Sequence, residues 1–189
     1  MSLTLNELAL YYRSDKGKLN QNKMKGHNYM KVYNHFLSKY QLYPFSMLEI
    51  GVRWGGSMNI WQDYFSSAIL YGIDIDPECE KFTNARVSIF TCDQSDKEGM
   101  KKIGDKIGKK ILSVIIDGGS HKASDIIASL EVMKDYLCEG GYYFIEDMDP
   151  NQDKQLVKDY VATLKDMQLL CYVPSEAMNN EELAVLKKL

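Results

Sequence analysis

The chain has 189 residues, which is enough for one ordinary domain because chains divide into several cores only beyond roughly 250 residues. Hydrophobic residues make up 45% and charged residues 26%, a composition that excludes disorder, collagen and coiled coil as descriptions of the whole chain. No apolar run reaches about 18 residues, and no basic stretch leads into an apolar N-terminal segment, so we expect neither a membrane span nor secretion. Four scattered cysteines without a CxxC pair predict reduced thiols in a cytoplasmic protein.

The net charge of -3 conceals a basic N-terminal segment. Between Leu8 and Leu48, seven basic side chains stand against the single Asp15, which gives a charge of +6. The basic residues are Arg13, Lys16, Lys18, Lys23, Lys25, Lys31 and Lys39. A solvated lysine-rich surface is the commoner explanation of such a segment, and contact with the phosphates of a nucleic acid or a nucleotide-linked substrate is the alternative.

The first 45 residues predict a short helical cap. Thr4 and Glu7 have the spacing of a capping box, which predicts a first helix, and residues 29–40 predict a second. The segment Gly17–His27 forms the loop between them. We therefore divide the chain into an N-terminal cap, residues 1–45, and a main domain, residues 46–189.

From Ser46 onward, short apolar runs alternate with segments of helical periodicity. The predicted strands are Met47–Gly51, Ile69–Asp74, Val87–Thr91, Leu112–Asp117, Tyr142–Ile145, Leu169–Val173 and Leu183–Leu186. The predicted helices between them are Ser57–Phe65, Lys97–Ile107 and Ala123–Leu137. This alternation is typical of an α/β fold with a doubly wound, mostly parallel seven-stranded sheet of the Rossmann-like kind.

A glycine-containing turn follows the first predicted strand and leads into a helix. Glycine lets the backbone approach a ligand closely, and the following helix presents unpaired N–H groups. The glycines Gly51 and Gly55 are separated by three residues, so the segment is neither a GxGxxG nucleotide fingerprint nor a GxxxxGK phosphate loop. A dinucleotide or triphosphate ligand is accordingly disfavoured.

Acidic residues follow the next two strands. Asp74 ends the second strand, where a carboxylate can accept both hydroxyl hydrogens of a ribose. After the third strand, Asp93 or Gln94 is placed to meet an adenine edge, although Asp93 or Ser95 could equally cap the following helix. Three such features at successive strand ends predict a ribose-bearing cofactor.

At these residues the sequence resembles the class I S-adenosylmethionine-dependent methyltransferases. Within them it is similar to the macrocin-type and mycinamicin-type sugar O-methyltransferases and the cephalosporin-hydroxylase-like proteins, over residues 12–148. The shared segments are Asp15-Lys-Gly17, His27-x-Tyr29-x-x-x-Tyr33, Leu48-Glu-Ile-Gly51, Trp61, Tyr71-Gly-Ile-Asp-Ile-Asp-Pro77, Asp93-Gln-Ser-Asp96, Ile116-Asp117, Gly119-Ser-His121 and Ile145-Glu-Asp147. Arg53 departs from the pattern, because many members have a further glycine there.

The resemblance implies S-adenosylmethionine as cofactor and a methyltransferase fold. The predicted cofactor-binding residues are Glu49, Gly51, Gly55, Ser57, Asp74, Asp93, Gln94 and Asp117.

His121 is the predicted catalytic residue. It follows the fourth strand at the entry of a helix, and an unperturbed imidazole with a pKa of about 6.5 suits general-base work near neutrality. The alternative is a histidine that only caps or packs at the start of that helix.

The acidic pair Glu146 and Asp147 at the end of the fifth strand is a candidate metal site. In the resembling sugar methyltransferases this pair binds magnesium together with a third carboxylate three residues before the histidine. Here that position is Gly118, and the neighbouring Asp117 would have to serve instead. Three outcomes are open: Asp117 reaches the ion, two carboxylates and water hold it, or the site is vestigial. We expect a weakened magnesium site.

His27 and Tyr29 are the predicted substrate contacts, because rings with polar tips suit the wall of a sugar pocket. Tyr12 and Tyr33 are further candidates, with Tyr33 also suited to the apolar stripe of the second helix.

The leading hypothesis is an O-methyltransferase acting on a small hydroxylated acceptor such as a sugar or nucleotide-sugar. A nucleic-acid methyltransferase is the first alternative, although the Asn/Asp-Pro-Pro-Tyr motif of the amino-methylating enzymes is missing. A cofactor-binding protein with degraded catalysis is the second, and an oxidoreductase comes last. The sequence leaves a homo-oligomer open.

Overall fold

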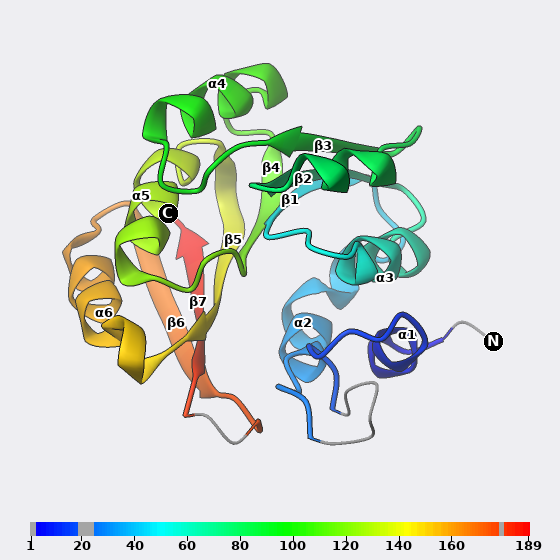
Figure 1. Cartoon of the computed structure of the whole chain (residues 1–189), viewed down its shortest axis with the longest axis horizontal. Helices are drawn as coiled ribbons and strands as arrows, with labels where there is room; N and C mark the ends of the chain where they lie inside the picture. Colours follow the sequence, from blue (N-terminus) through cyan, green and yellow to red (C-terminus); the bar gives the residue numbers. More distant parts are fainter. Residues whose placement is uncertain (1–2, 19–24, 178–179) are drawn as a thin grey trace.

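The computed structural model describes residues 3–18, 25–177 and 180–189. In these residues, seven strands form one sheet in the order β3-β2-β1-β4-β5-β7-β6 (Figure 1). The strands are β1 (Phe45–Ile50), β2 (Ala68–Asp74), β3 (Val87–Thr91), β4 (Leu112–Asp117), β5 (Leu137–Met148), β6 (Met167–Pro174) and β7 (Glu182–Lys188). β7 runs antiparallel to β5 and β6, and the remaining described pairs are parallel. The predicted fold class is confirmed.

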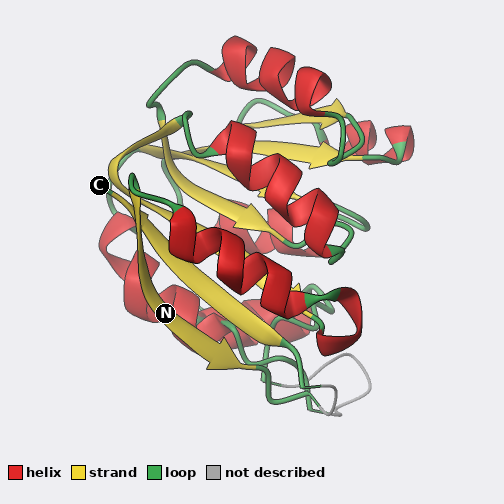
Figure 2. Ribbon diagram, turned by 90° about the vertical axis from the view of Figure 1, so that its left-hand side faces the viewer, coloured by secondary structure: helices red, strands yellow, loops and turns green. Residues whose placement is uncertain are grey.

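Helices cover both faces of the sheet (Figure 2). The α-helices are α1 (Leu5–Tyr11), α2 (Met30–Leu37), α3 (Gly56–Tyr64), α4 (Lys97–Ile107), α5 (Ala123–Met133) and α6 (Lys154–Thr163). Three short 3-10 segments are η1 (Ser38–Tyr40), η2 (Pro77–Phe82) and η3 (Pro150–Gln152). α1, α2 and α3 share one apolar cluster with the sheet, and α4, α5 and α6 share the other.

The strands are apolar on both faces because both faces are covered. In β4, Val114 and Ile116 pack toward α1–α3 while Ile115 packs toward α4–α6, and all three side chains are buried. Successive side chains of a strand point to opposite faces, so a shift of one residue exchanges the two sides. This alternation later decides where the acidic residues at the strand ends lie.

Two predicted boundaries around α5 were wrong. The helix was expected to run to Leu137, but it ends at Met133, and Leu137 instead begins β5 by pairing with Leu112. Leu137 continues the apolar spacing of the helix, so periodicity alone could not separate the two elements. Gly140 and Gly141 lie inside β5 beside an irregularity of its register, where Gly140 has φ +77°.

The helix α6 was not predicted. Its buried residues are Val157 and Val161, and the partly buried Tyr160 and Leu164 pack against the same apolar cluster. These four residues have the i, i+3, i+4, i+7 spacing of one helix face, so the signal was present in the sequence and was missed.

The N-terminal segment packs on the sheet as expected for a cap. Thr4 and Glu7 form the predicted capping box at the start of α1. The second predicted helix begins at Met30 and changes to the 3-10 segment η1 after Leu37. Residues 19–24 of the predicted loop, which include Lys23 of the basic segment, lie outside the described residues. The division between residues 45 and 46 stays a prediction.

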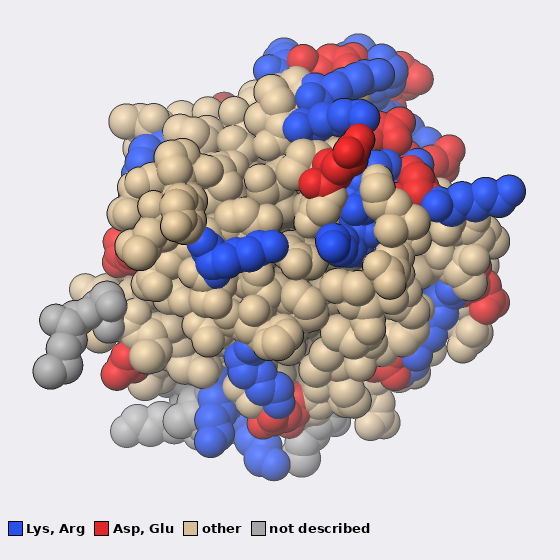
Figure 3. All heavy atoms as spheres, turned by 180° about the vertical axis from the view of Figure 1, so that it is seen from behind, with Lys and Arg blue, Asp and Glu red and all other residues tan. Residues whose placement is uncertain are grey.

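Three of the described basic residues of the N-terminal segment make separate contacts. Lys16 is mostly buried in an ion pair, Lys31 pairs with Glu176, and Lys39 donates to the hydroxyl of Tyr142. The other three, Arg13, Lys18 and Lys25, are exposed. On the face shown in Figure 3, charged side chains gather mainly over α4. None of the helices in the described residues combines the length and apolar character needed to cross a membrane.

Two leucines differ in burial, and this difference predicts different effects of their replacement on stability. Leu130 on α5 is 0% exposed and Leu42 is 81% exposed. We expect Leu130→Ala to lower the free energy of unfolding by about 2–5 kcal/mol, because it leaves a cavity in a packed interior. The matched Leu42→Ala should change it by no more than about 0.5 kcal/mol. Urea unfolding of both variants measures the difference, and equal effects would contradict this packing.

Candidate active site

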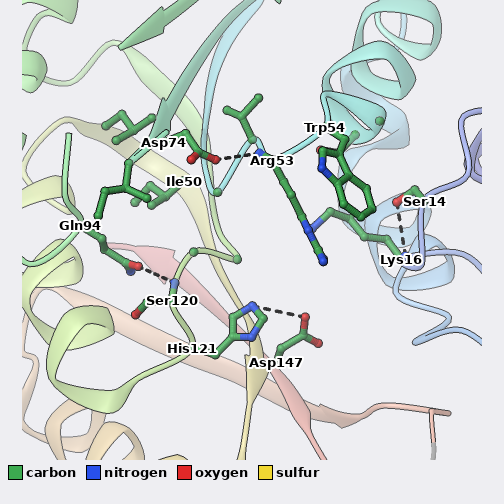
Figure 4. Close-up of a pocket in the computed structure, with 18 of the residues that line it drawn as sticks. Ser14, Lys16, Ile50, Arg53, Trp54, Asp74, Gln94, Ser120, His121 and Asp147 are labelled. Atoms are coloured by element: carbon green, nitrogen blue, oxygen red, sulfur yellow. Dashed lines mark hydrogen bonds and ion pairs between the residues drawn. The ribbon is translucent and has the colours of Figure 1, made fainter. Parts of the chain in front are cut away.

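A cavity of about 900 Å³ lies at the carboxyl ends of the parallel strands (Figure 4). This is the edge where open α/β sheets bind their ligands. Its walls come from the segment before α2 and from the turns after β1, β2, β3, β4 and β5. The lining includes residues 12–16, 50–54, 56–57, 73–75, 92–94, 118–122, 125 and 147.

The turn after β1 passes against the turn after β4, backbone on backbone. Gly51 has φ +89°, and a Cβ atom there would stand 2.4 Å from the carbonyl oxygen of Gly118. The amide of Gly118 in turn donates to the carbonyl of Ile50 at 3.0 Å. Only glycine meets both the conformation and the space at position 51. Gly51 therefore shapes the cavity floor.

Two residues of the same predicted motif do not line the cavity. Gly55 has φ +72°, and a Cβ there would meet the ring of Phe82 at 2.7 Å, so this glycine serves the packing of α3. Glu49 is fully buried and accepts a hydrogen bond from the indole of Trp61 at 3.1 Å. Gly55 and Glu49 are outside the cavity lining, whereas Ser57 is part of it. Their roles in cofactor binding stay predictions.

Asp74 lies at the cavity edge at the end of β2. Its Oδ2 accepts from the amide of Arg53 at 2.7 Å, and its Oδ1 accepts from the amide of Asp76 at 2.9 Å. These bonds fix the carboxylate, and each oxygen keeps capacity for a further donor. The position suits recognition of a diol.

Asp93 and Gln94 also line the cavity, after β3. Asp93 accepts from the amide and hydroxyl of Ser95, bonds that lower the pKa of its carboxyl. The expected alternative, a helix cap at Asp93 or Ser95, was wrong, because Asp96 caps α4 by accepting from the amide of Gly99.

Asp117 lies on the other side of the sheet from the position expected of a metal ligand. Its carboxylate accepts from Gln94 at 2.7 and 2.9 Å, from Ser129 at 2.5 Å and from Tyr143 at 3.2 Å. Burial raises the pKa of Asp117 to about 6. Because Asp117 pairs in register with Ile145, it shares a face with that residue and not with Glu146.

Gln94 connects this buried group to the cavity. While its amide nitrogen holds Asp117, its Oε1 accepts from the amide of Ser120 at 2.9 Å. The loop that carries His121 is thereby tied to the turn after β3. Asp117 thus reaches the cavity through Gln94 and through the cavity-lining amide of Gly119, which donates to it at 3.5 Å. Its predicted roles as cofactor contact and metal ligand stay predictions, and its place across the sheet from Glu146 does not favour the metal role.

His121 and Asp147 face each other across the cavity mouth (Figure 4). The imidazole Nε2 lies 3.6 Å from Asp147 Oδ2, and 36% of the histidine side chain is exposed. Both residues have left-handed backbones, with φ +63° at His121 and +52° at Asp147. Such strained backbones cluster at functional sites.

His27 and Tyr29 lie behind Asp147 and do not line the cavity. The hydroxyl of Tyr29 donates to Asp147 Oδ1 at 2.8 Å, and His27 Nδ1 lies 3.1 Å from the same oxygen. Burial alone would raise the pKa of Asp147, but the hydrogen bond and charge of His27, together with the charges of His121 and Lys16, hold it at about 2. These two side chains therefore orient Asp147, and their predicted contact with a substrate stays a prediction.

The expected magnesium ligands do not come together. Glu146 turns away from Asp147 toward α2, where it accepts from Tyr33 at 2.5 Å and pairs with the ammonium of Lys16. Gly118 contributes no side chain, and Asp117 lies on the opposite face. Magnesium prefers an octahedron of oxygen ligands. The residues present do not fit the three-carboxylate site of the resembling enzymes.

A different group among the described residues has ligand atoms within 4.8 Å of one another: His27, Asp147 and Glu181. It shares Asp147 with the expected site but adds an imidazole nitrogen, a ligand that suits transition metals better than magnesium.

Three cavity residues were not predicted as functional. Lys16 belongs to the shared segment Asp15-Lys-Gly17, but nothing in that segment indicates which residues Lys16 contacts. Trp54 is 76% exposed at the rim, and the guanidinium of Arg53 stacks 4.5 Å from the centre of a Trp54 ring. Arg53 stands where many members of the resembling family have a glycine, and this difference was the available signal that its side chain lies at the cavity.

Curated relatives of the chain are O-methyltransferases. An L-olivosyl-oleandolide 3-O-methyltransferase of Streptomyces antibioticus is 31% identical over 151 residues, which cover 76% of this chain and 36% of the relative. A rhamnosyl tetracenomycin-C 2'-O-methyltransferase of Streptomyces olivaceus is 29% identical over 148 residues, 75% of this chain and 36% of the relative. No family model matches the chain.

The chain is a relative of the S-adenosylmethionine-dependent sugar O-methyltransferases. It spans about a third of the length of the curated relatives, with coverage of 32% to 36%. The MycE methyltransferase solved with magnesium, S-adenosylhomocysteine and mycinamycin VI superposes with a TM-score of 0.79 at 24% identity, over 99% of this chain and 55% of that one. This likeness confirms that the chain has the methyltransferase fold.

The buried carboxyl of Glu49 gives a pH prediction. Burial raises the pKa of Glu49 to about 7. Because this lies above the unfolded value of about 4.3, the stability contributed by protonated Glu49 is full at low pH and is lost as the pH rises through the folded pKa. From about pH 5 to about pH 8, wild type should lose on the order of 2 kcal/mol relative to Glu49→Gln.

Urea unfolding of wild type and Glu49→Gln across this pH range measures the effect. A difference between the two proteins that is independent of pH would mean that Glu49 is ionised throughout.

Proposed function

We propose that the chain is an S-adenosylmethionine-dependent O-methyltransferase that methylates a hydroxyl of a small molecule, of the sugar or nucleotide-sugar class. The observation that carries the proposal is the composition of the cavity walls. On one wall, the carboxylate of Asp74 is held where it can accept hydrogen bonds from a diol, and the His121–Asp147 pair lies on another wall. The relatives supply the reaction class, since those named above are sugar O-methyltransferases.

The residues present fit the cofactor. A cavity of about 900 Å³ has room for a nucleoside with an amino-acid tail and for part of an acceptor. The side-chain-free backbone of Gly51, Gly118 and Gly119 lines its floor, and Asp74 can accept the hydroxyl hydrogens of the ribose. When bound, S-adenosylmethionine supplies an electrophilic methyl group on a sulfonium.

His121 is the group that receives the acceptor proton. At 3.6 Å, Nε2 and the carboxylate of Asp147 are too far apart for a hydrogen bond, so Nε2 has room for an acceptor hydroxyl beside it. As the hydroxyl loses its proton, the imidazole becomes positively charged. Asp147, held ionised by His27 and oriented by Tyr29, stabilises that charge.

The nucleic-acid alternative loses three of the basic residues that suggested it. Lys16, Lys31 and Lys39 are each engaged in separate internal contacts, which leaves Arg13, Lys18 and Lys25 exposed among the described ones. The relatives named above act on small acceptors. A small acceptor is therefore the preferred class.

The base is tested with His121→Asn, because asparagine tolerates the left-handed backbone of this position. We expect kcat to fall by about 10²–10⁴-fold, the usual contribution of a general base, with unchanged affinity for S-adenosylhomocysteine. Methyl transfer to a panel of sugars and nucleotide-sugars and isothermal titration measure the two quantities. The exposed His35→Asn is the matched control and should alter neither. Retained turnover in His121→Asn would exclude His121 as the base.

The cavity floor is tested with Gly51→Ala and Gly140→Ala. Both positions have positive φ, so both variants carry a backbone strain of about 1–2 kcal/mol. Only at Gly51 does the new methyl group meet the Gly118 carbonyl, whereas at Gly140 the closest atom lies at 4.0 Å. We expect Gly51→Ala alone to lose binding of S-adenosylhomocysteine by at least about tenfold, more than 1.4 kcal/mol. Equal affinities by isothermal titration would mean that the cofactor lies elsewhere.

A further inference from the structure

A single ammonium group lies between two buried carboxylates beneath the cavity. Lys16 pairs with Glu146, and its Nζ lies 3.6 Å from Glu49 Oε1. Both carboxylate side chains are 0% exposed, and the lysine side chain is 14% exposed. The three residues come from the segment before α2, from β1 and from β5. Buried carboxylates at such a place need a cation or a proton to offset the loss of hydration.

Gly118 borders this ion pair. A Cβ atom at position 118 would stand 2.3 Å from Glu146 Oε2 and 3.4 Å from Lys16 Nζ. The backbone of Gly118 does not have a positive φ, so its conformation does not require glycine. A side chain at this position would enter the space that the ammonium and the Glu146 carboxylate now fill. The ammonium and a carboxylate at position 118 therefore compete for one place.

With Lys16 present, the charges of Lys16, Glu49 and Glu146 balance. An additional divalent ion would leave this group with an excess of positive charge. One ammonium neutralises one carboxylate, and burial raises the pKa of the second, Glu49, to about 7 so that it is protonated below neutrality. A divalent ion beside Glu146 would have to approach the ammonium of Lys16 in a region with little water. Repulsion between two like charges at such a distance opposes its binding.

We infer that the ammonium of Lys16 takes the place of a divalent cation at Glu146, and that the chain binds its ligands without magnesium. Lys16 is a positioning residue: it ties the segment that lines one wall of the cavity to the ends of β1 and β5. The adjoining Asp147 is then held by Tyr29 and His27 instead of by an ion. The inference rests on the proposed function only for the test that measures methyl transfer, because the metal titrations need no activity.

The first test is metal binding by the wild-type protein. After treatment with a chelating resin, the protein is titrated with MgCl₂ and MnCl₂ by isothermal titration and by thermal shift, with NaCl at matched ionic strength as reference. We expect no binding below the millimolar range and no change of melting temperature beyond the NaCl reference. Micromolar binding of either ion, or methyl transfer lost on chelation and restored by magnesium, would overturn the inference.

The second test asks whether removing the ammonium creates a cation site. Lys16→Met leaves the two carboxylates without their cation, so MnCl₂ should raise the melting temperature of this variant. The exposed Lys18→Met, from the same segment, is the matched control and should not respond. Lys16→Met combined with Gly118→Asp should bind manganese more tightly than Lys16→Met alone. If neither Lys16 variant responds, the ammonium does not occupy a cation site and the inference is wrong.

Two further measurements separate the alternatives. If wild type binds an ion and His27→Gln abolishes that binding, the ion lies among His27, Asp147 and Glu181, and the inference is overturned. Binding of S-adenosylhomocysteine is measured on the same samples without metal. Failure to bind it would count against the proposed function, while the metal titrations would still decide the role of Lys16.

Discussion

The contact between the turns after β1 and β4 is the constraint on which the site depends. Gly51 and Gly118 lie backbone against backbone, and the Gly118 amide closes the contact on the Ile50 carbonyl. This contact brings the loop of His121 over the floor of the cavity. It also leaves position 118 beside Glu146 and Lys16. The same absence of side chains that opens the cavity thus leaves position 118 without the carboxylate that the resemblance implies there.

Most of the fold could be predicted because apolar strands and helix periodicity are local signals. The strands Val87–Thr91 and Leu112–Asp117 were predicted to the residue. At Leu137 the prediction failed because the apolar spacing of the helix continues into the next strand. The helix α6 was missed although Val157, Val161 and Leu164 have helical spacing. The site was harder to predict, because which face a carboxylate occupies depends on register. Asp117 and Glu146 both end buried strands, yet pairing of Asp117 with Ile145 separates them across the sheet. The partners of Lys16 are contributed by strands 33 and 130 residues away and leave no mark in the sequence near it.

The acidic residues at the strand ends are kept in place by different means. Asp117 is surrounded by neutral donors, Glu146 is paired with an ammonium, and Asp147 is held by a histidine and a tyrosine. These different environments give two of the carboxyl groups different pKa values, about 6 for Asp117 and about 2 for Asp147. At the cavity mouth, Asp147 is therefore firmly charged at neutral pH beside the imidazole of His121. Similar groups acquire separate roles from their surroundings.

The two tryptophans of the chain occupy opposite environments. Trp61 is 0% exposed and donates to Glu49, whereas Trp54 is 76% exposed at the rim of the cavity. A dissolved quencher such as iodide reaches only the second of these indoles. The protein therefore carries its own optical reporter: the quenchable part of its fluorescence comes from one side chain at the entrance, and any molecule that covers the entrance becomes visible without a label.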